Sequence, residues 1–119
     1  MIAVGIDIEE VDRFHSLIRD DKFLERIYTP AEIEYCRSKK NAPQHFAVRF
    51  AAKEAVWKAM SDLIHKKKLN LGHLDIGVKN SETGKPVVVL SRRFSSYSKK
   101  ISLSLSHTKS TVVAVAVFG

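Results

Sequence analysis

The sequence contains a single cysteine, Cys36, only three prolines and five glycines, and no long apolar segment. One cysteine cannot form an internal disulfide, which fits a protein that folds in a reducing compartment. The longest unbroken apolar run, Val112–Phe118, has seven residues, whereas a membrane-spanning helix needs about 20. The N-terminal residues reach the acidic Asp7 without a basic region, so we expect no signal peptide and a cytoplasmic protein.

No internal repeat, low-complexity tract or linker-like segment interrupts the chain. Its 119 residues, of which 45% are hydrophobic and 28% are charged, match an ordinary globular domain with one core. We therefore expect one domain over residues 1–119. Disordered and fibrous classes of protein are excluded.

Negative charge is in short supply, because 13 Asp and Glu residues stand against 20 Lys and Arg residues, for a net charge of +7. A chain this basic favours an acidic partner, which could be nucleic acid, anionic lipid, a phosphorylated small molecule or an acidic protein. The sequence has no nucleic-acid recognition motif, and its aromatic residues do not alternate with the basic pairs. A basic binding module without catalysis stays open as the alternative to an enzyme.

Alternating apolar residues predict a β-strand at the start of the chain, over residues 2–8. Ile and Val at the even positions form one face of this strand, which places Asp7 on the opposite face. A short helix over residues 11–18 should follow. Thr29, Pro30 and Glu32 then have the spacing of a capping box with proline at the first helical position. A second helix should therefore run from residue 30 to about residue 40.

Residues 44–65 form the longest helical pattern, and apolar side chains cover nearly its whole circumference. Such a helix is expected at the centre of the core, with Trp57 among the core aromatic residues. Its charged residues are costly in that position and require an explanation. They are Arg49, Lys53, Glu54 and Lys58.

The second half of the chain has strand character. Strands are expected over residues 74–79, 86–90, 101–106 and 111–118, with a turn at 80–84 and a short helix near 91–98. Only residues 107–110 separate the last two strands, which predicts a hairpin. The expected fold class is α+β, with a long central helix packed on a mostly antiparallel β-sheet.

Two carboxylates and one ammonium group could meet on the long helix. Glu54 and Lys58 are four residues apart with the acid first, which is the favourable order for an ion pair within a helix. If Asp7 faces the same side of that helix, the three groups instead form the kind of site that holds Mg²⁺ and a phosphate. The spacing leaves both interpretations open.

Histidine and hydroxyl side chains meet in the expected hairpin turn. Ser106, His107 and Thr108 could bind an anion, or they could form an ordinary exposed turn. The other four histidines have no metal-ligand spacing and are expected on the surface: His15, His45, His65 and His73.

Three further segments match the pattern of one family. They are Gly5–Ile8 with Arg13 and Phe14 downstream, Arg49–Ala55 continuing to Lys58 and Ala59, and Ser104–Thr108. Together with a Gly-Lys-Pro turn at residues 84–86, they resemble the short 4′-phosphopantetheinyl transferases, and the RFAAKEA segment is the most specific of them. The chain length is similar to that of the trimeric branch of this family, which implies a homotrimer with active sites between subunits.

This resemblance implies transfer of the 4′-phosphopantetheine arm of coenzyme A to a serine of apo-acyl carrier protein, with release of adenosine 3′,5′-bisphosphate, in fatty acid biosynthesis. Asp7 and Glu54 would be the Mg²⁺ ligands, and Glu54 and Lys58 the catalytic residues. The residues implied to bind coenzyme A are Arg49, Lys58, Ser61, Lys85, Pro86, His107 and Thr108. Those implied to bind the acidic carrier protein are Arg13, Lys22, Phe23 and Arg26, although Phe23 could instead belong to the core.

One segment departs from the family pattern. The family usually has a glycine-rich loop after the Lys-Ala pair, whereas here residues 60–63 continue the helical pattern. Part of the contact that this loop makes with coenzyme A is then expected from Ser61 or from the lysines at 66–68.

Overall fold

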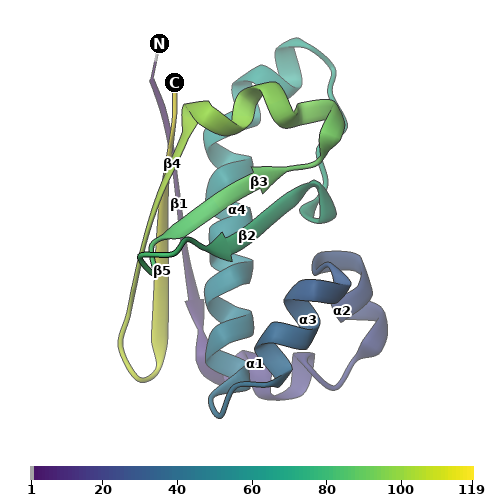
Figure 1. The fold of residues 1–119 in the computed structure, drawn as a ribbon, viewed down its shortest axis with the longest axis vertical. Coiled ribbons are helices and arrows are strands. Elements are labelled where there is room, and N and C mark those ends of the chain that lie inside the picture. The colour runs from purple at the N-terminus through teal and green to yellow at the C-terminus, as the bar shows by residue number, and fades with distance from the viewer. Residues whose placement is uncertain (1) are drawn as a thin grey trace.

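The computed structural model describes residues 2–119 and has one long helix at its centre (Figure 1). The strands are β1 (Ala3–Glu10), β2 (Ile76–Asn80), β3 (Pro86–Leu90), β4 (Ile101–His107) and β5 (Thr111–Phe118). The helices are α1 (Val11–Leu17), α2 (Asp21–Ile27), α3 (Pro30–Arg37) and α4 (Ala42–Lys66), with short 3₁₀ helices η1 (His73–Asp75) and η2 (Arg92–Lys100). None of the helices in the described chain is long and apolar enough to cross a membrane.

The strands of the described chain form two antiparallel sheets, where the sequence suggested one. β1, β5 and β4 lie in that order in a three-stranded sheet, in which Asp7 pairs with Ala114. β2 and β3 form a separate hairpin, which crosses in front of α4 in Figure 1. The expected hairpin of β4 and β5 is confirmed, as is the α+β class with a long helix on antiparallel strands.

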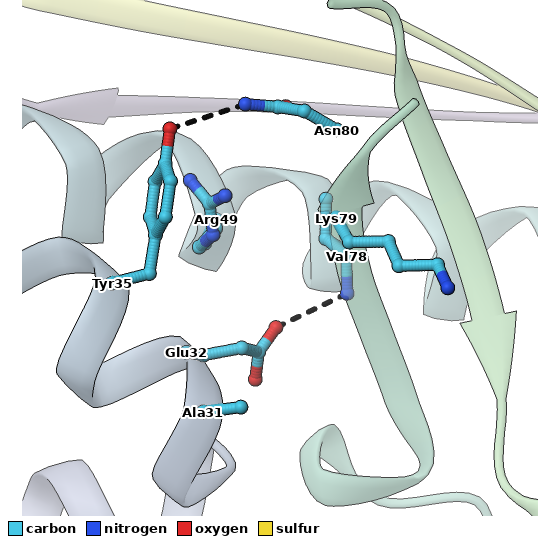
Figure 2. A pocket seen from close by; sticks show the side chains of 7 residues that line it. All are labelled: Ala31, Glu32, Tyr35, Arg49, Val78, Lys79 and Asn80. Carbon is cyan, nitrogen blue, oxygen red and sulfur yellow. Dashed lines mark hydrogen bonds between the residues drawn. The ribbon is translucent and has the colours of Figure 1, made fainter. Parts of the chain in front are cut away.

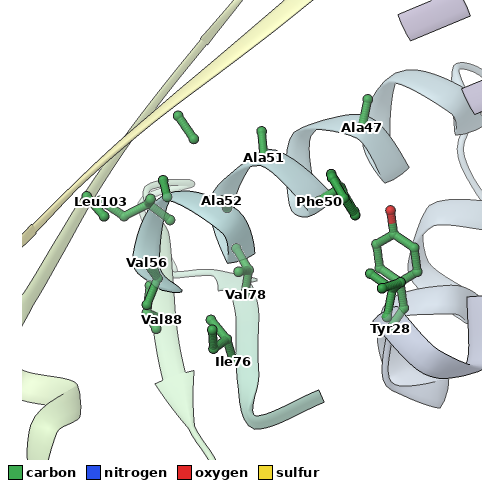
Figure 3. Close-up of a cluster of buried hydrophobic side chains, with 14 of the residues drawn as sticks. Tyr28, Ala47, Phe50, Ala51, Ala52, Val56, Ile76, Val78, Val88 and Leu103 are labelled. Carbon is green, nitrogen blue, oxygen red and sulfur yellow. The ribbon is translucent and has the colours of Figure 1, made fainter. Parts of the chain in front are cut away.

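α4 lies at the centre of the core, as its sequence predicted, and it packs on β1 and β5. Figure 3 shows its buried residues Ala51, Ala52 and Val56 among side chains from β2, β3 and β4. At the other end of the core, the hydroxyl group of the buried Tyr28 donates a hydrogen bond to the Phe46 carbonyl oxygen at 2.7 Å. The N-terminal helices are thereby fixed to the first turns of α4.

One charged side chain of α4 is completely buried. The ammonium group of Lys53 donates hydrogen bonds to Glu32 Oε1 at 2.8 Å and to the carbonyl oxygens of His73 at 3.0 Å and Ile76 at 2.7 Å. The pKa of Lys53 is lowered, chiefly by burial, although the Glu32 carboxylate acts in the opposite direction. All three donors of the ammonium group have acceptors, so Lys53 ties α3 and the chain leading into β2 to α4.

The apolar side chains of β1 face away from α4. Val4, Ile6 and Ile8 are each more than half exposed, so the alternation predicted from the sequence is confirmed, but its apolar face is the outer one. Directly paired residues of an antiparallel sheet share a face, and three half-buried valines of β5 lie opposite these residues. The outer sheet face defined in this way consists of Val4, Ile6, Ile8, Val113, Val115 and Val117.

β1 approaches the backbone of α4 at Gly5. A Cβ atom added at Gly5 would lie far inside contact distance of the Ala55 carbonyl oxygen and 2.6 Å from the Ala59 nitrogen. Only glycine, which has no side chain, permits this approach. Asp7 follows two residues later on the same face of the strand, so the approach also sets the distance of Asp7 from α4.

The other helices follow the sequence with differences in detail. α3 has the predicted capping box, in which Thr29 Oγ1 accepts a hydrogen bond from the Glu32 N–H and the Glu32 carboxylate accepts one from the Thr29 N–H. α3 ends at Arg37 rather than near residue 40, and α2 is a separate helix that was not predicted.

The expectation that Trp57 is a core residue is wrong. Its side chain is 40% exposed, and its indole N–H donates a hydrogen bond to the Leu71 carbonyl oxygen at 3.1 Å.

We expect Gly5→Ala to destabilise the protein by about 1–3 kcal/mol or more, because the added methyl group would push β1 away from α4. Chemical unfolding followed by circular dichroism measures the change. Gly72→Ala is the matched control, since a Cβ atom there would meet only Asp75 Oδ2, at 3.9 Å, and stability should change little. Equal unfolding midpoints for the two variants would contradict the close approach at Gly5.

Candidate active site

β1 and α4 bring a carboxylate and an ammonium group together. Lys58 Nζ donates hydrogen bonds to Asp7 Oδ1 at 3.2 Å and to the Ile6 carbonyl oxygen at 3.1 Å. The Asp7 side chain is 10% exposed, whereas that of Lys58 is 50% exposed. The ion pair therefore joins strand to helix, and Lys58 pairs with Asp7 rather than with Glu54.

Glu54 instead contacts a histidine that the sequence placed on the surface. His73 Nε2 lies 3.0 Å from Glu54 Oε2, and about a third of each side chain is exposed. The His73 ring stacks on Phe50, with 5.7 Å between the ring centroids and 15° between their planes. Because 19 residues separate His73 from Glu54, no spacing in the sequence signalled this contact.

A third carboxylate, that of Glu9, belongs to the same group and was not predicted as a site residue. Glu9 is buried and accepts a hydrogen bond from Arg13 Nη1 at 2.7 Å. Burial is the main reason that the pKa of Glu9 is raised to about 7, and hydrogen bonding to Asp7 and its negative charge add to this effect. Arg13 acts in the opposite direction. The sequence did contain a signal for Glu9, because the alternation of side chains along β1 places Glu9 on the same face of the strand as Asp7.

The acidic group fits a cation. Asp7 Oδ2 is buried, and when Glu9 is ionised no group among the residues that the structure describes donates a hydrogen bond to it. A buried carboxylate oxygen of this kind needs a cation or the proton of Glu9. Asp7 and Glu54 suit a hard ion such as Mg²⁺, which takes one or two protein carboxylates together with substrate oxygens and water. Within residues 2–119, no group of three or more His, Cys, Asp or Glu residues could hold a metal ion by itself.

A second group of predicted residues begins with Arg49. This residue is buried, and its guanidinium group lies over the Tyr35 ring, 4.4 Å from the centroid. Both residues line the pocket of Figure 2, together with Glu32 and Asn80. Arg49 Nε has no hydrogen-bond partner in the described part of the chain, so this cation keeps an unused donor.

His107 and Thr108, at the end of β4, lie against the first turns of α4. Gln44 Nε2 is 3.2 Å from His107 Nδ1 and donates a hydrogen bond to the Thr108 carbonyl oxygen at 3.3 Å. The pKa of the neighbouring His45 is lowered, mainly by burial and then by nearby positive charges, among them that of Arg49. Side chains with positive charge and N–H donors gather here, which suits an anion.

Arg49 and Lys58 lie on different sides of α4. Arg49 and Lys58 are separated by about two and a half helical turns, so their side chains point in opposite directions. The chain brings Asp7 to Lys58 and His73 to Glu54, and Arg49 points away from Lys58.

The remaining residues implied to bind coenzyme A are not gathered in one place either. Ser61 follows Lys58 by one turn of α4, and its hydroxyl group donates to the Lys58 carbonyl oxygen at 2.8 Å. Lys85 is exposed in the turn before β3, and Pro86 begins that strand. α4 continues as a helix through residues 60–63, as its sequence predicted.

The residues implied to bind a carrier protein lie on α1 and α2. Arg13, Lys22 and Arg26 are exposed. Phe23 is buried, and its ring packs against those of Phe14, Phe50 and Tyr28. Of the two roles considered for Phe23, the structure therefore shows the one in the core.

The raised pKa of Glu9 makes stability depend on pH. Its ordinary value is 4.5 and its value in the folded protein is about 7, so the folded state holds this proton more tightly than the unfolded chain. The resulting stabilisation is complete below pH 4.5 and is lost as the pH rises to 7, with a loss of at most about 3 kcal/mol. We expect Glu9→Gln to remove this slope from unfolding curves measured without divalent cations. Glu10→Gln, at the exposed neighbouring residue, should keep it.

Comparison with known proteins assigns the chain to a family. Residues 3–116 match the 4′-phosphopantetheinyl transferase superfamily. The holo-[acyl-carrier-protein] synthase of Caldicellulosiruptor bescii is 42% identical over 119 residues, which cover 96% of this chain and 94% of that protein. The holo-[acyl-carrier-protein] synthase of Geobacter sp. is 39% identical in an alignment of 122 positions. The alignment covers 97% of this chain and 95% of that protein.

Two crystal structures have the same fold. The holo-(acyl-carrier-protein) synthase of Bacillus anthracis, in complex with CoA (3′,5′-ADP), is 37% identical with a TM-score of 0.77, over 98% of this chain and 94% of that chain. The holo-[acyl-carrier-protein] synthase of Helicobacter pylori, in complex with coenzyme A, is 31% identical with a TM-score of 0.77. The match covers 98% of this chain and 99% of that chain. The chain belongs to the 4′-phosphopantetheinyl transferase superfamily.

Proposed function

We propose that the chain carries out the reaction of holo-[acyl-carrier-protein] synthases, in the cytoplasm and in fatty acid biosynthesis. In this reaction, the 4′-phosphopantetheine arm of coenzyme A is transferred to a serine of apo-acyl carrier protein, and adenosine 3′,5′-bisphosphate is released. The observation that carries the proposal is the Asp7–Lys58 pair beside Glu54, which offers carboxylates and an exposed ammonium group to a pyrophosphate. The names of the relatives and the coenzyme A in two related structures support the same reaction.

Mg²⁺ is the proposed cofactor, and Asp7 and Glu54 would hold it. The buried Asp7 Oδ2 supports this assignment, because hard carboxylate oxygens suit the ion. When bound, Mg²⁺ would neutralise part of the charge on the pyrophosphate of coenzyme A. Two carboxylates leave most coordination positions to substrate oxygens and water.

Lys58 is the proposed stabiliser of the leaving group. Transfer breaks the bond between the β-phosphorus and the bridging oxygen of the pyrophosphate, so negative charge develops on the departing nucleotide phosphate. The ammonium group of Lys58 is already ordered by Asp7 and the Ile6 carbonyl oxygen, and half of the side chain is exposed. It can therefore meet that charge with little reorganisation. Glu54, directly or through water, would take the proton of the carrier serine.

The nucleotide phosphates of coenzyme A are assigned to the second group. Arg49, His107 and Thr108 offer cationic and polar donors there, and Ser61, Lys85 and Pro86 are the further proposed contacts. Within one chain, Arg49 points away from Lys58 on α4. A neighbouring copy of the chain would therefore have to supply the second group to complete the site.

A homotrimer with sites between its subunits would meet this requirement. The outer sheet face supports such an assembly, because soluble monomers rarely leave a contiguous apolar patch uncovered. The strand that carries much of this face, β1, also carries Asp7 on its other face. Contact between copies would thus lie directly behind the acidic group.

The carrier protein is proposed to dock on α1 and α2. Arg13, Lys22 and Arg26 are exposed on these helices, and Arg13 reaches the acidic group through its hydrogen bond to Glu9. An acidic carrier helix would be drawn to these cations, and the attraction would weaken as salt screens it.

We expect light scattering after size-exclusion chromatography to give three times the 13.4 kDa mass of one chain. Val4→Lys should dissociate the assembly and lower the transfer rate, because it places a charge in the outer sheet face. Val89→Lys is the control, since Val89 is an exposed valine on β3, outside that face, and the mass should not change. Full transfer activity from wild-type protein that elutes as a single chain would rule out the trimer.

The reaction itself is tested by weighing apo-acyl carrier protein after incubation with the protein, coenzyme A and Mg²⁺. The carrier should gain the mass of one phosphopantetheine group, and EDTA should prevent the gain. Asp7→Asn and Glu54→Gln should each lower the turnover number about 100-fold while circular dichroism stays unchanged. Lys58→Met should lower the turnover number more than the affinity for coenzyme A.

A basic binding module without catalysis makes the opposite predictions. The mass of the carrier would stay unchanged, and the protein would instead bind duplex DNA tightly with a steep dependence on salt. Near-wild-type turnover in both carboxylate variants at limiting Mg²⁺ would remove Asp7 and Glu54 from the proposed metal site.

A further inference from the structure

His73 contacts Glu54 but has no part in the reaction described above. Its Nε2 atom lies 3.0 Å from Glu54 Oε2. A carboxylate that binds a cation can only accept hydrogen bonds, so the contact proposed here uses the tautomer of His73 that has its proton on Nε2. We propose that His73 is a positioning residue, which holds the Glu54 carboxylate in the orientation required to bind a divalent cation. The inference rests on the proposed role of Glu54.

The backbone of His73 is held by the buried ion pair. Lys53 Nζ donates hydrogen bonds to two carbonyl oxygens. One belongs to His73, the first residue of η1, and the other to Ile76, which follows the last residue of η1. Glu32 holds Lys53 from the other side at 2.8 Å. The Asp75 carboxylate also accepts a hydrogen bond from the Gly72 N–H at 2.9 Å and closes the turn. The peptide that carries the imidazole is therefore fixed.

The ring of His73 is held as well. It stacks on Phe50 at 15° between planes, and Phe50 packs in turn against Phe14 and Phe23 in the core. Rotation of the imidazole would break this stacking contact. With backbone and ring both constrained, the Nε2 donor has a defined position from which to orient Glu54.

One donor at Oε2 is enough to orient the carboxylate. It restrains rotation of the carboxylate group, and lone pairs on Oε1 remain for a cation. A hydrogen bond of this type behind a metal ligand typically changes metal affinity by 10–100-fold. Its loss should therefore weaken cation binding and leave the contacts with coenzyme A and the carrier in place.

The kinetic test compares His73→Phe with His73→Gln. Phenylalanine keeps a ring on Phe50 but has no donor, whereas glutamine supplies a side-chain N–H. We expect His73→Phe to raise the Mg²⁺ concentration for half-maximal transfer about tenfold, with kcat at saturating Mg²⁺ and the KM for coenzyme A within about twofold of wild type. His73→Gln should restore the Mg²⁺ requirement to within about threefold. His15→Phe, at an exposed histidine of α1, is the control and should match wild type.

Binding of Mn²⁺ in the presence of coenzyme A, followed by electron paramagnetic resonance, gives a readout that does not depend on turnover. His73→Phe should weaken Mn²⁺ binding about tenfold, and it should have no further effect in a Glu54→Ala background. Equal Mn²⁺ affinity for wild type and His73→Phe, or an equal loss in the Glu54→Ala background, would overturn the proposal. Failure of the proposed function looks different, because wild-type protein would then leave the mass of the carrier unchanged.

Discussion

The close approach of β1 to α4 at Gly5 is the constraint on which the site depends. The strand backbone lies against the helix backbone at Ala55 and Ala59, next to the two positions that carry functional groups, Glu54 and Lys58. Two residues beyond Gly5, the strand presents Asp7 at 3.2 Å from Lys58 Nζ. Any side chain at position 5 would push β1 away from α4. The absence of a side chain at Gly5 therefore sets the distance between Asp7 and Lys58.

The same contact explains why β1 has its apolar side outside. A strand on a core usually buries its apolar face and exposes its polar one. In β1 the helix-facing positions hold small or acidic residues, such as Gly5 and Asp7, and the branched side chains therefore face outward. The arrangement leaves these apolar side chains exposed in a single chain. In the proposed trimer, the contact between copies and the acidic site would therefore lie on the two faces of one strand.

Local signals in the sequence predicted much of the fold. The capping box of Thr29 and Glu32, the apolar circumference of α4 and the short turn between β4 and β5 depend on nearby residues, and all three are confirmed. Local signals did not predict which charged residues of α4 contact which residues elsewhere in the chain. Lys58 stands four residues from Glu54, yet it pairs with Asp7 because tertiary packing brings β1 within reach. The contact of His73 with Glu54 likewise arises only when η1 folds against α4.

Burial separates the charges of α4, which look alike in the sequence. Lys53 is enclosed and all its donors have acceptors within the protein, so it cannot reach a ligand. Lys58 also has a carboxylate partner, but half of its side chain is exposed to solvent, so a ligand can reach it. The two classes are nevertheless connected. Lys53 fixes the backbone of His73, and His73 Nε2 lies 3.0 Å from Glu54 Oε2. A buried charge of the core is therefore connected to Glu54 through a single turn of 3₁₀ helix.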